Sequence, residues 1–184
     1  MKSILISIKP KYVAKILNGE KTIEIRKTMP QCDLPIDVYI YCTKDKEHLY
    51  RHFDNKFMVL RKYNKLCSHN GKVVAKFTLN KVEKIELNTY FKKNQPYETD
   101  TLCERFIQLN GCLTGEEYIN YSKGKPTCGW VIDDLVIFDK PKELSKFCGV
   151  KQYFVGCESG IDKTPRYAQL TKAPQSWCYI ETGE

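Results

Sequence analysis

The chain has 184 residues, of which 42% are hydrophobic and 28% are charged, and its formal net charge is +8. This composition excludes a disordered chain and predicts one domain spanning residues 1–184. No apolar run approaches the ~20 residues of a membrane-spanning helix, and the first residues lack the long apolar stretch of a signal peptide. We therefore expect a cytoplasmic protein without membrane attachment, and the positive charge favours anionic partners such as nucleic acid.

Regular apolar patterns define the elements at the start of the chain. Residues 4–8 alternate in the way that is typical of a strand. Pro10 then begins a short amphipathic helix, and Gly19 provides its C-terminal cap. Residues 22–27 and residues 36–42 predict two further strands, because β-branched residues recur in both.

Residues 45–70 are charged and mixed, and we expect an insertion here. Within it, residues 46–53 predict a short helix. His48 and His52 would then lie one turn apart and could offer two ligands to a metal, with His69 loosely nearby. No acidic general base accompanies them, so we assign no metal site.

The second half of the chain predicts more strands and two helices. The expected strands cover residues 72–87, 129–141 (with an interruption at Asp133 and Asp134) and 173–181, whereas the expected helices cover residues 102–114 and 114–124 and a polar loop covers 89–101. Residues 149–184 form a C-terminal extension. These elements predict an α+β domain built on a small, mostly antiparallel β-barrel with short peripheral helices.

Nine cysteines are present, and their odd number and irregular spacing argue against disulfides. There is no C-x-x-C pair, so the usual zinc-ribbon signature is absent. Buried thiols that act as small hydrophobes are one interpretation. A structural zinc bound by some of Cys148, Cys157 and Cys178 is the other.

A group of charges in the second expected strand is the main candidate for a site. Glu24 and Arg26 share one face of this strand, and Lys21 precedes them. A carboxylate between two cations could accept hydrogen bonds from a base, while Lys21 and Arg26 could hold a phosphate. The alternative is a solvated ion pair worth at most ~1 kcal/mol.

Four other residues could extend this ligand site. Lys9 and Lys44 follow strands and could form a basic rim. Gln175 and Trp177 could line the same cleft, because aromatic side chains hold bases by stacking. Trp177 could equally dock into the core. We find no Walker loop and no G-x-S-x-G motif, and we expect no cofactor.

Residues 19–26 carry the pattern G-x-K-x-x-E-x-R, which resembles the signature of the ASCH domain family. The segments around residues 37–44, 70–79, 129–141 and 173–181 are also similar to longer bacterial members. The resemblance implies a PUA-like β-barrel with a cleft lined by the signature residues. It also implies RNA or nucleotide-type ligands and a regulatory role in RNA metabolism, transcription or translation.

Three functions follow from this resemblance and stay open. The first is an RNA- or nucleotide-binding module, which needs a continuous basic path out of the cleft. The second is a ribonuclease or a modified-nucleoside amidohydrolase, with Lys21 as base or charge stabiliser and Glu24 as its acid/base partner. One amidohydrolase branch has a threonine where this chain has Glu24, so its activity does not transfer. The third is a protein-interaction adaptor with an exposed apolar patch in residues 45–70.

Overall fold

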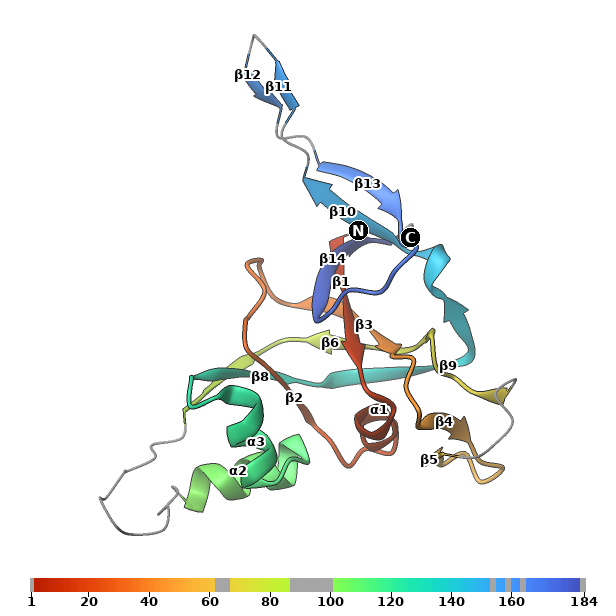
Figure 1. The fold of residues 1–184 in the computed structure, drawn as a ribbon, viewed down its shortest axis with the longest axis vertical. Helices are drawn as coiled ribbons and strands as arrows, with labels where there is room; N and C mark the ends of the chain where they lie inside the picture. The colour runs from red at the N-terminus through yellow and green to blue at the C-terminus, as the bar shows by residue number, and fades with distance from the viewer. Residues whose placement is uncertain are drawn as a thin grey trace.

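The computed structural model describes residues 2–61, 67–86, 101–152, 155–157, 160–162 and 165–182. It is mostly β, with three α-helices among these residues (Figure 1). The helices are α1 (Pro10–Leu17), α2 (Thr101–Gly111) and α3 (Gly115–Ser122). The strands are β1 (Lys2–Ile8), β2 (Ile23–Arg26), β3 (Ile36–Cys42), β4 (His48–Arg51), β5 (Phe57–Leu60), β6 (Lys72–Leu79), β7 (Val82–Ile85), β8 (Thr127–Val131), β9 (Asp133–Glu143), β10 (Cys148–Gln152), β11 (Val155–Cys157), β12 (Gly160–Asp162), β13 (Pro165–Gln169) and β14 (Trp177–Glu181).

One large sheet has the strand order β13-β10-β14-β1-β3-β6-β9. Strands β1 and β3 are parallel and the other neighbours are antiparallel. A smaller sheet has the order β2-β8-β7. The expected mostly antiparallel pairing is confirmed, but the expected closed barrel is not, because β13 and β9 are open edges of the large sheet. Strands β2 and β7 both pair with β8 in the separate smaller sheet.

The first three elements follow the sequence closely. Helix α1 has Pro10 in its first turn and buries its apolar residues Val13, Ile16 and Leu17. Gly19 follows the helix with φ 76°, as expected for a C-terminal glycine. The chain then turns directly into β2, which pairs with β8 and places Glu24 opposite Trp130.

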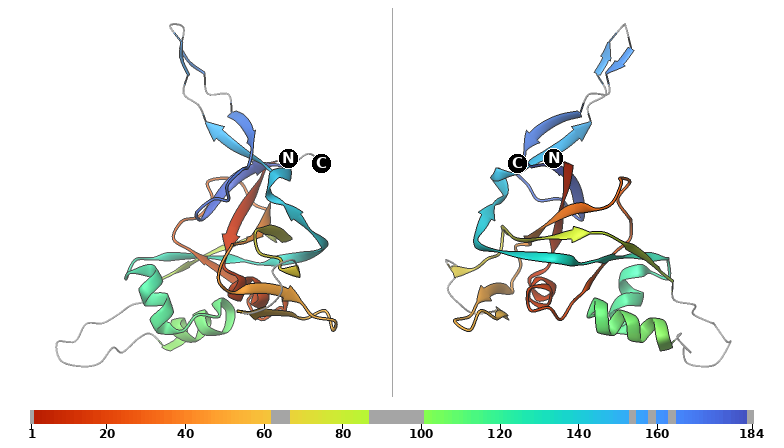
Figure 2. Two further views of the ribbon diagram at one scale, coloured as in Figure 1. Left: turned by 45° about the vertical axis from the view of Figure 1, so that its right-hand side comes forward. Right: turned by 180° about the vertical axis from the view of Figure 1, so that it is seen from behind.

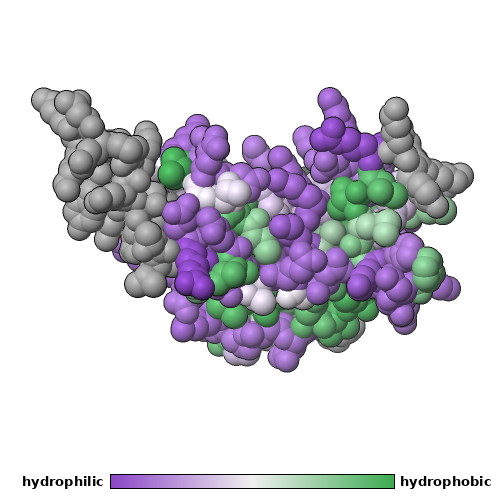
Figure 3. All heavy atoms as spheres, turned by 90° about the horizontal axis from the view of Figure 1, so that it is seen from below, coloured by the Kyte–Doolittle hydropathy of each residue, from purple (hydrophilic) through white to green (hydrophobic). Residues whose placement is uncertain are grey.

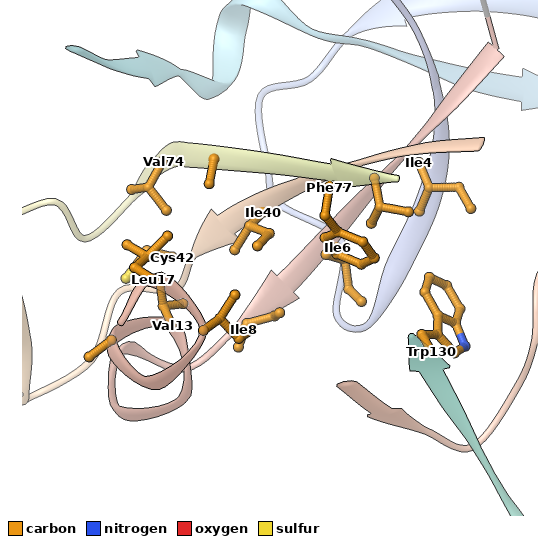
Figure 4. Packing of buried hydrophobic residues seen from close by; sticks show 14 of the residues in the cluster. Ile4, Ile6, Ile8, Val13, Leu17, Ile40, Cys42, Val74, Phe77 and Trp130 are labelled. Atoms are coloured by element: carbon orange, nitrogen blue, oxygen red, sulfur yellow. The ribbon is translucent and has the colours of Figure 1, made fainter. Parts of the chain in front are cut away.

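The main core lies between the large sheet and the elements packed against it. Figure 4 shows Ile4, Ile6 and Ile8 of β1 pointing toward the same interior as Phe77 of β6, with Trp130 of β8 at one end. These side chains are at most 2% exposed. Since burial removes apolar surface from water, this cluster provides the main stabilisation of the fold.

Residues 48–60 form a hairpin of the two strands β4 and β5, so the expected helix over residues 46–53 is wrong. Leu49 of β4 and Phe57 of β5 point inward and are buried in the main core. The side chain of Asn18 donates to the Phe57 carbonyl and accepts from the Phe57 N–H, both at 2.9 Å. These contacts attach the hairpin to the end of α1, which no local pattern indicates.

Two long expected strands are each divided between the sheets. The described part of residues 72–87 contains β6 and β7, and residues 129–141 form parts of β8 and β9. The second division lies at Ile132, directly before the expected interruption at Asp133 and Asp134, and Asp134 has φ 47° at the start of β9. Each division sends the chain from one sheet to the other. The expected polar loop over residues 89–101 lies almost wholly outside the described residues.

The C-terminal part contains strands that the sequence did not predict. Strands β10 and β13 pair at one end of the large sheet, and β11 and β12 project beyond them (Figures 1 and 2). The predicted strand β14 is confirmed, and it lies between β10 and β1. Within the described residues, no helix has both the length and the apolar character that crossing a membrane requires.

The zinc alternative has no support in the described residues, where no group of three metal-ligating side chains occurs. Cys148 pairs in register with Glu181, so Cys178 lies three residues, or ~10 Å, along the neighbouring strand. These two thiols cannot share one zinc ion. The side chain of Cys157 lies outside those described.

The histidines of residues 45–70 are also separated. His48 lies on β4 and contacts the Ser68 hydroxyl through Nδ1 at 3.0 Å. His52 follows the strand and pairs with Asp54 at 2.9 Å. Because β4 is extended rather than helical, His48 and His52 do not share a helix face, and the two-ligand arrangement does not form.

We expect the free energy of unfolding of the protein to depend on pH through His69. Burial lowers the pKa of His69 from its ordinary value of 6.5. The unfolded chain therefore binds more protons between the two pKa values, and the free energy of unfolding falls as the pH drops below about 6.5 through the folded pKa. We expect urea denaturation from pH 7.5 to 5 to show this loss, and His69→Gln to reduce it. An unchanged pH dependence in the variant would contradict this assignment.

Candidate functional site

The charged residues of the second strand are buried. Lys21, Glu24 and Arg26 are 3%, 7% and 8% exposed, respectively. Both faces of β2 are covered, because Ile23 and Ile25 pack in a second cluster with α2 and α3. The alternative of a solvated surface pair is therefore wrong, and the structure brings the three predicted charges together inside the protein.

The Lys21 ammonium contacts two backbone carbonyls and one carboxylate. Its Nζ donates to the carbonyls of Ile23 (2.7 Å) and Gly111 (2.6 Å) and lies 3.4 Å from Glu24 Oε2. Two of the three donors of the ammonium are therefore used in hydrogen bonds to carbonyls, and the contact with Glu24 is an ion pair. The contact with Gly111 needs a close approach of α2 to β2, since a Cβ at Gly111 would lie 2.7 Å from Ile25 Cδ1. Lys21 thus ties the end of α2 to the strand that carries Glu24.

Glu24 bridges two cations. Its Oε1 lies 3.0 Å from Arg26 Nη2, while its Oε2 faces Lys21. Arg26 Nη2 also donates to the Ser7 carbonyl at 2.7 Å, and Arg26 Nη1 to the Ser176 hydroxyl at 3.3 Å. Arg26 Nε is buried and has no hydrogen-bond partner among the described residues. A carboxylate has about four lone-pair positions, so Glu24 retains acceptor capacity after binding both cations.

These residues line a cavity of about 420 Å³, which we call the binding cavity. Its volume is within the range of small-molecule sites. Its walls come from the ends of β1 and β3, from β2, from α1 and α3, and from the loop before β14. The lining residues are Ser7, Ile8, Lys9, Tyr12, Lys21, Glu24, Ile25, Arg26, Thr43, Lys44, Asp45, Leu113, Glu117, Tyr121 and Gln175.

Two tyrosines that the sequence did not predict stand on different helices around the cavity. Tyr12 belongs to α1 and Tyr121 to α3, and both are half-buried. Burial raises the pKa of both phenols, so each stays protonated at neutral pH and can donate or accept a hydrogen bond. Helix α3 is fixed by a capping box in which Thr114 and Glu117 exchange hydrogen bonds. The sequence predicts both helices, but not that they meet over β2.

The structure places three of the four other predicted ligand residues at the cavity. Lys9, Lys44 and Gln175 are partly or fully exposed on its lining. Trp177 is not among the lining residues. Its ring packs against Trp130, with ring centroids 5.6 Å apart, and its Nε1 donates to Thr28 Oγ1 at 3.1 Å. Trp177 therefore supports the core, because its position on β14 directs it toward β8.

Comparison with known proteins identifies the fold. No family model matches the sequence, and no curated protein matches it. The structure is similar to an ASCH protein from Zymomonas mobilis, with a TM-score of 0.51, 19% identity, and coverage of 77% of this chain and 73% of that one. A serine-to-alanine variant of that protein gives a TM-score of 0.57 and 16% identity over 97% of this chain and 88% of that one.

The chain therefore has the ASCH fold, and the resemblance drawn from residues 19–26 is confirmed at the level of the fold.

Proposed function

We propose that the protein is an RNA- or nucleotide-binding module and that the binding cavity receives a nucleobase. The observation that carries this proposal is the buried Glu24 carboxylate on the cavity lining, held between Lys21 and Arg26. Its remaining lone pairs can accept from the exocyclic amine or the ring N–H of a base. Tyr12 and Tyr121 contribute aromatic rings to the lining of the same cavity, and base stacking on such rings contributes ~1–3 kcal/mol per base.

In this proposal Lys21 and Arg26 orient Glu24, whereas the phosphate is bound by other residues. Lys21 already makes two hydrogen bonds to carbonyls and an ion pair with Glu24, and both terminal nitrogens of Arg26 already have protein partners. The exposed Lys9 and Lys44 on the rim are better placed to meet a phosphate. A lysine on the rim acts as a mobile point charge, which suits a sequence-independent phosphate contact.

The enzyme alternative uses the same cavity. It requires Lys21 to act as a base or charge stabiliser, but the structure engages this ammonium with two carbonyls and a carboxylate. The adaptor alternative requires an apolar patch on residues 45–70. In the described part of that segment, Phe53 is 90% exposed, and Figure 3 shows hydrophobic residues interspersed with hydrophilic ones on the lower face of the molecule. Both alternatives are outcomes of the following test.

Fluorescence anisotropy with labelled single- and double-stranded RNA and DNA, at two salt concentrations, tests the proposal. We expect the wild type to bind single-stranded RNA and the variant Lys9→Gln/Lys44→Gln to bind about tenfold more weakly at low salt, because two phosphate contacts are lost. The control Lys81→Gln/Lys84→Gln removes the same charge from two exposed residues, one directly before β7 and one within it. We expect it to bind like the wild type.

Three other outcomes would contradict the proposal or favour an alternative function. Equal losses in the two double variants would show that binding depends only on net charge. RNA that is cleaved on a gel after incubation would favour the enzyme. A wild type that binds no oligonucleotide and no nucleotide would overturn the proposal and favour the adaptor.

A further inference from the structure

A second hollow lies beside the binding cavity and shares a wall with it. Its volume is about 700 Å³, and we call it the outer hollow. It is lined by Lys44, Asp45, Lys46, His48, Arg61, Ser68 and Asn70. Lys44 and Asp45 also line the binding cavity, so the two spaces meet at these residues.

The lining of the outer hollow is mainly cationic. Lys44, Lys46 and Arg61 provide three positive charges, and Asp45 is the acid among the lining residues. The Asp45 carboxylate accepts from the Lys46 backbone N–H at 2.6 Å. Arg61 uses Nε to bind Glu47 at 3.3 Å, which leaves its two terminal nitrogens for a ligand. Within the described part of the chain, neither Lys44 nor Lys46 has a carboxylate at ion-pair distance.

Asn70 holds the wall of the outer hollow in place. Its side chain donates to the Glu47 carbonyl at 2.7 Å and accepts from the Leu49 N–H at 2.9 Å. Its backbone N–H donates to the Ser68 hydroxyl, which also contacts His48. These bonds connect β4 to the start of β6, so the hollow is formed by hydrogen-bonded backbone rather than by side chains alone.

Gly71 helps to place the lysine that the two spaces share. A Cβ at Gly71 would lie 3.0 Å from Lys44 Cε and 3.4 Å from Lys44 Cγ. The aliphatic part of Lys44 therefore lies against the backbone of Gly71, which has φ 81°. This contact fixes the stem of Lys44 and leaves its ammonium between the two spaces.

We propose that the outer hollow binds phosphates of nucleotides adjoining the one in the binding cavity, so the ligand is a single-stranded polynucleotide segment. This inference rests on the proposed function. A buried cavity can take a base only when the base is unstacked, as in single-stranded RNA. The outer hollow is lined by cations, and the His48 imidazole is the aromatic ring among its lining residues. Such a lining suits contact with the phosphate backbone of the polynucleotide rather than with its bases.

The test compares oligonucleotides with mononucleotides. The variant is Lys46→Gln/Arg61→Gln, which leaves every residue of the binding cavity in place, and the control is again Lys81→Gln/Lys84→Gln. A labelled random-sequence RNA octamer is titrated by fluorescence anisotropy at several salt concentrations. The four ribonucleoside 5′-monophosphates are measured separately by ligand-observed NMR. Thermal melting checks that the variants are folded.

We expect Lys46→Gln/Arg61→Gln to weaken octamer binding about tenfold at low salt and to reduce the salt slope by about 1.4, since each phosphate contact on a single strand contributes about 0.7. Mononucleotide binding is expected to stay unchanged, and the control is expected to behave as the wild type.

Two results would overturn the inference. In the first, the octamer binds no more tightly than a mononucleotide, and Lys9→Gln/Lys44→Gln abolishes binding of the mononucleotide. The proposed function then stands, but the outer hollow has no role in binding. If Lys46→Gln/Arg61→Gln and the control weaken octamer binding equally, the effect is one of net charge. If neither octamer nor mononucleotide binds the wild type, the proposed function itself fails.

Discussion

We expect Glu24→Ala to lower the free energy of unfolding by about 3–5 kcal/mol, the cost of breaking a buried ion pair by removing one partner. The substitution leaves two cations close together in the interior, since the side chains of Lys21 and Arg26 are 2% and 10% exposed. The measurement is urea denaturation followed by circular dichroism.

A surface ion pair provides the matched control for Glu24→Ala. Glu143 pairs with Lys72 at 3.4 Å, and its side chain is 60% exposed. Because solvent screens such a pair, Glu143→Ala is expected to cost at most about 1 kcal/mol. Similar costs for the two substitutions would mean that the charges at β2 contribute no more than an exposed pair, contrary to their burial.

We expect Trp130→Ala to lower the free energy of unfolding by about 3–5 kcal/mol, because a large buried side chain is replaced by a cavity. Trp130 is fully buried at one end of the main core, and its Nε1 donates to the Thr28 carbonyl at 3.3 Å (Figure 4). It also pairs with Glu24 across β2 and β8, so its loss would disturb the strand that carries the site.

Trp177 is the matched control for Trp130. The Trp177 ring packs against the Trp130 ring but is only half-buried. Trp177→Ala is therefore expected to lower the free energy of unfolding clearly less than Trp130→Ala. Trp177 lies outside the lining of the binding cavity, and we expect Trp177→Ala to leave oligonucleotide binding unchanged. A larger loss of stability for Trp177→Ala than for Trp130→Ala would contradict the packing described, and a loss of binding would place Trp177 in the site.

Local patterns were sufficient for the parts of the fold that depend on neighbouring residues. The alternation in residues 4–8, Pro10 at the start of α1 and Thr114 at the start of α3 each determine local backbone structure, and the structure confirms the elements that they predict. The signature in residues 19–26 also indicated three charges that meet, and they do.

Features that depend on distant contacts were not predictable in this way. Residues 48–51 form a strand rather than part of a helix because Leu49 enters the main core and Asn70 binds its backbone. The expected strand over residues 72–87 divides because β7 pairs with β8 in the other sheet. Tyr12 joins the cavity only because α1 and α3 converge, which no periodicity along the chain expresses.

The sequence also could not predict the hydrogen-bond partners of the buried charges. The pattern could place Lys21 beside Glu24, but it could not show that the Gly111 carbonyl would take one of the Lys21 donors. This contact comes from the end of α2, which is remote in sequence. It changes the role that we assign to Lys21 from binding phosphate to positioning Glu24.

The measurement that tests the central claim most directly is a crystal structure of the protein with a short single-stranded RNA. We predict a base in the binding cavity, with an N–H group of the base donating to the Glu24 carboxylate and the base ring stacked on Tyr12 or Tyr121. RNA bound elsewhere on the protein, with the cavity holding no base, would contradict the claim.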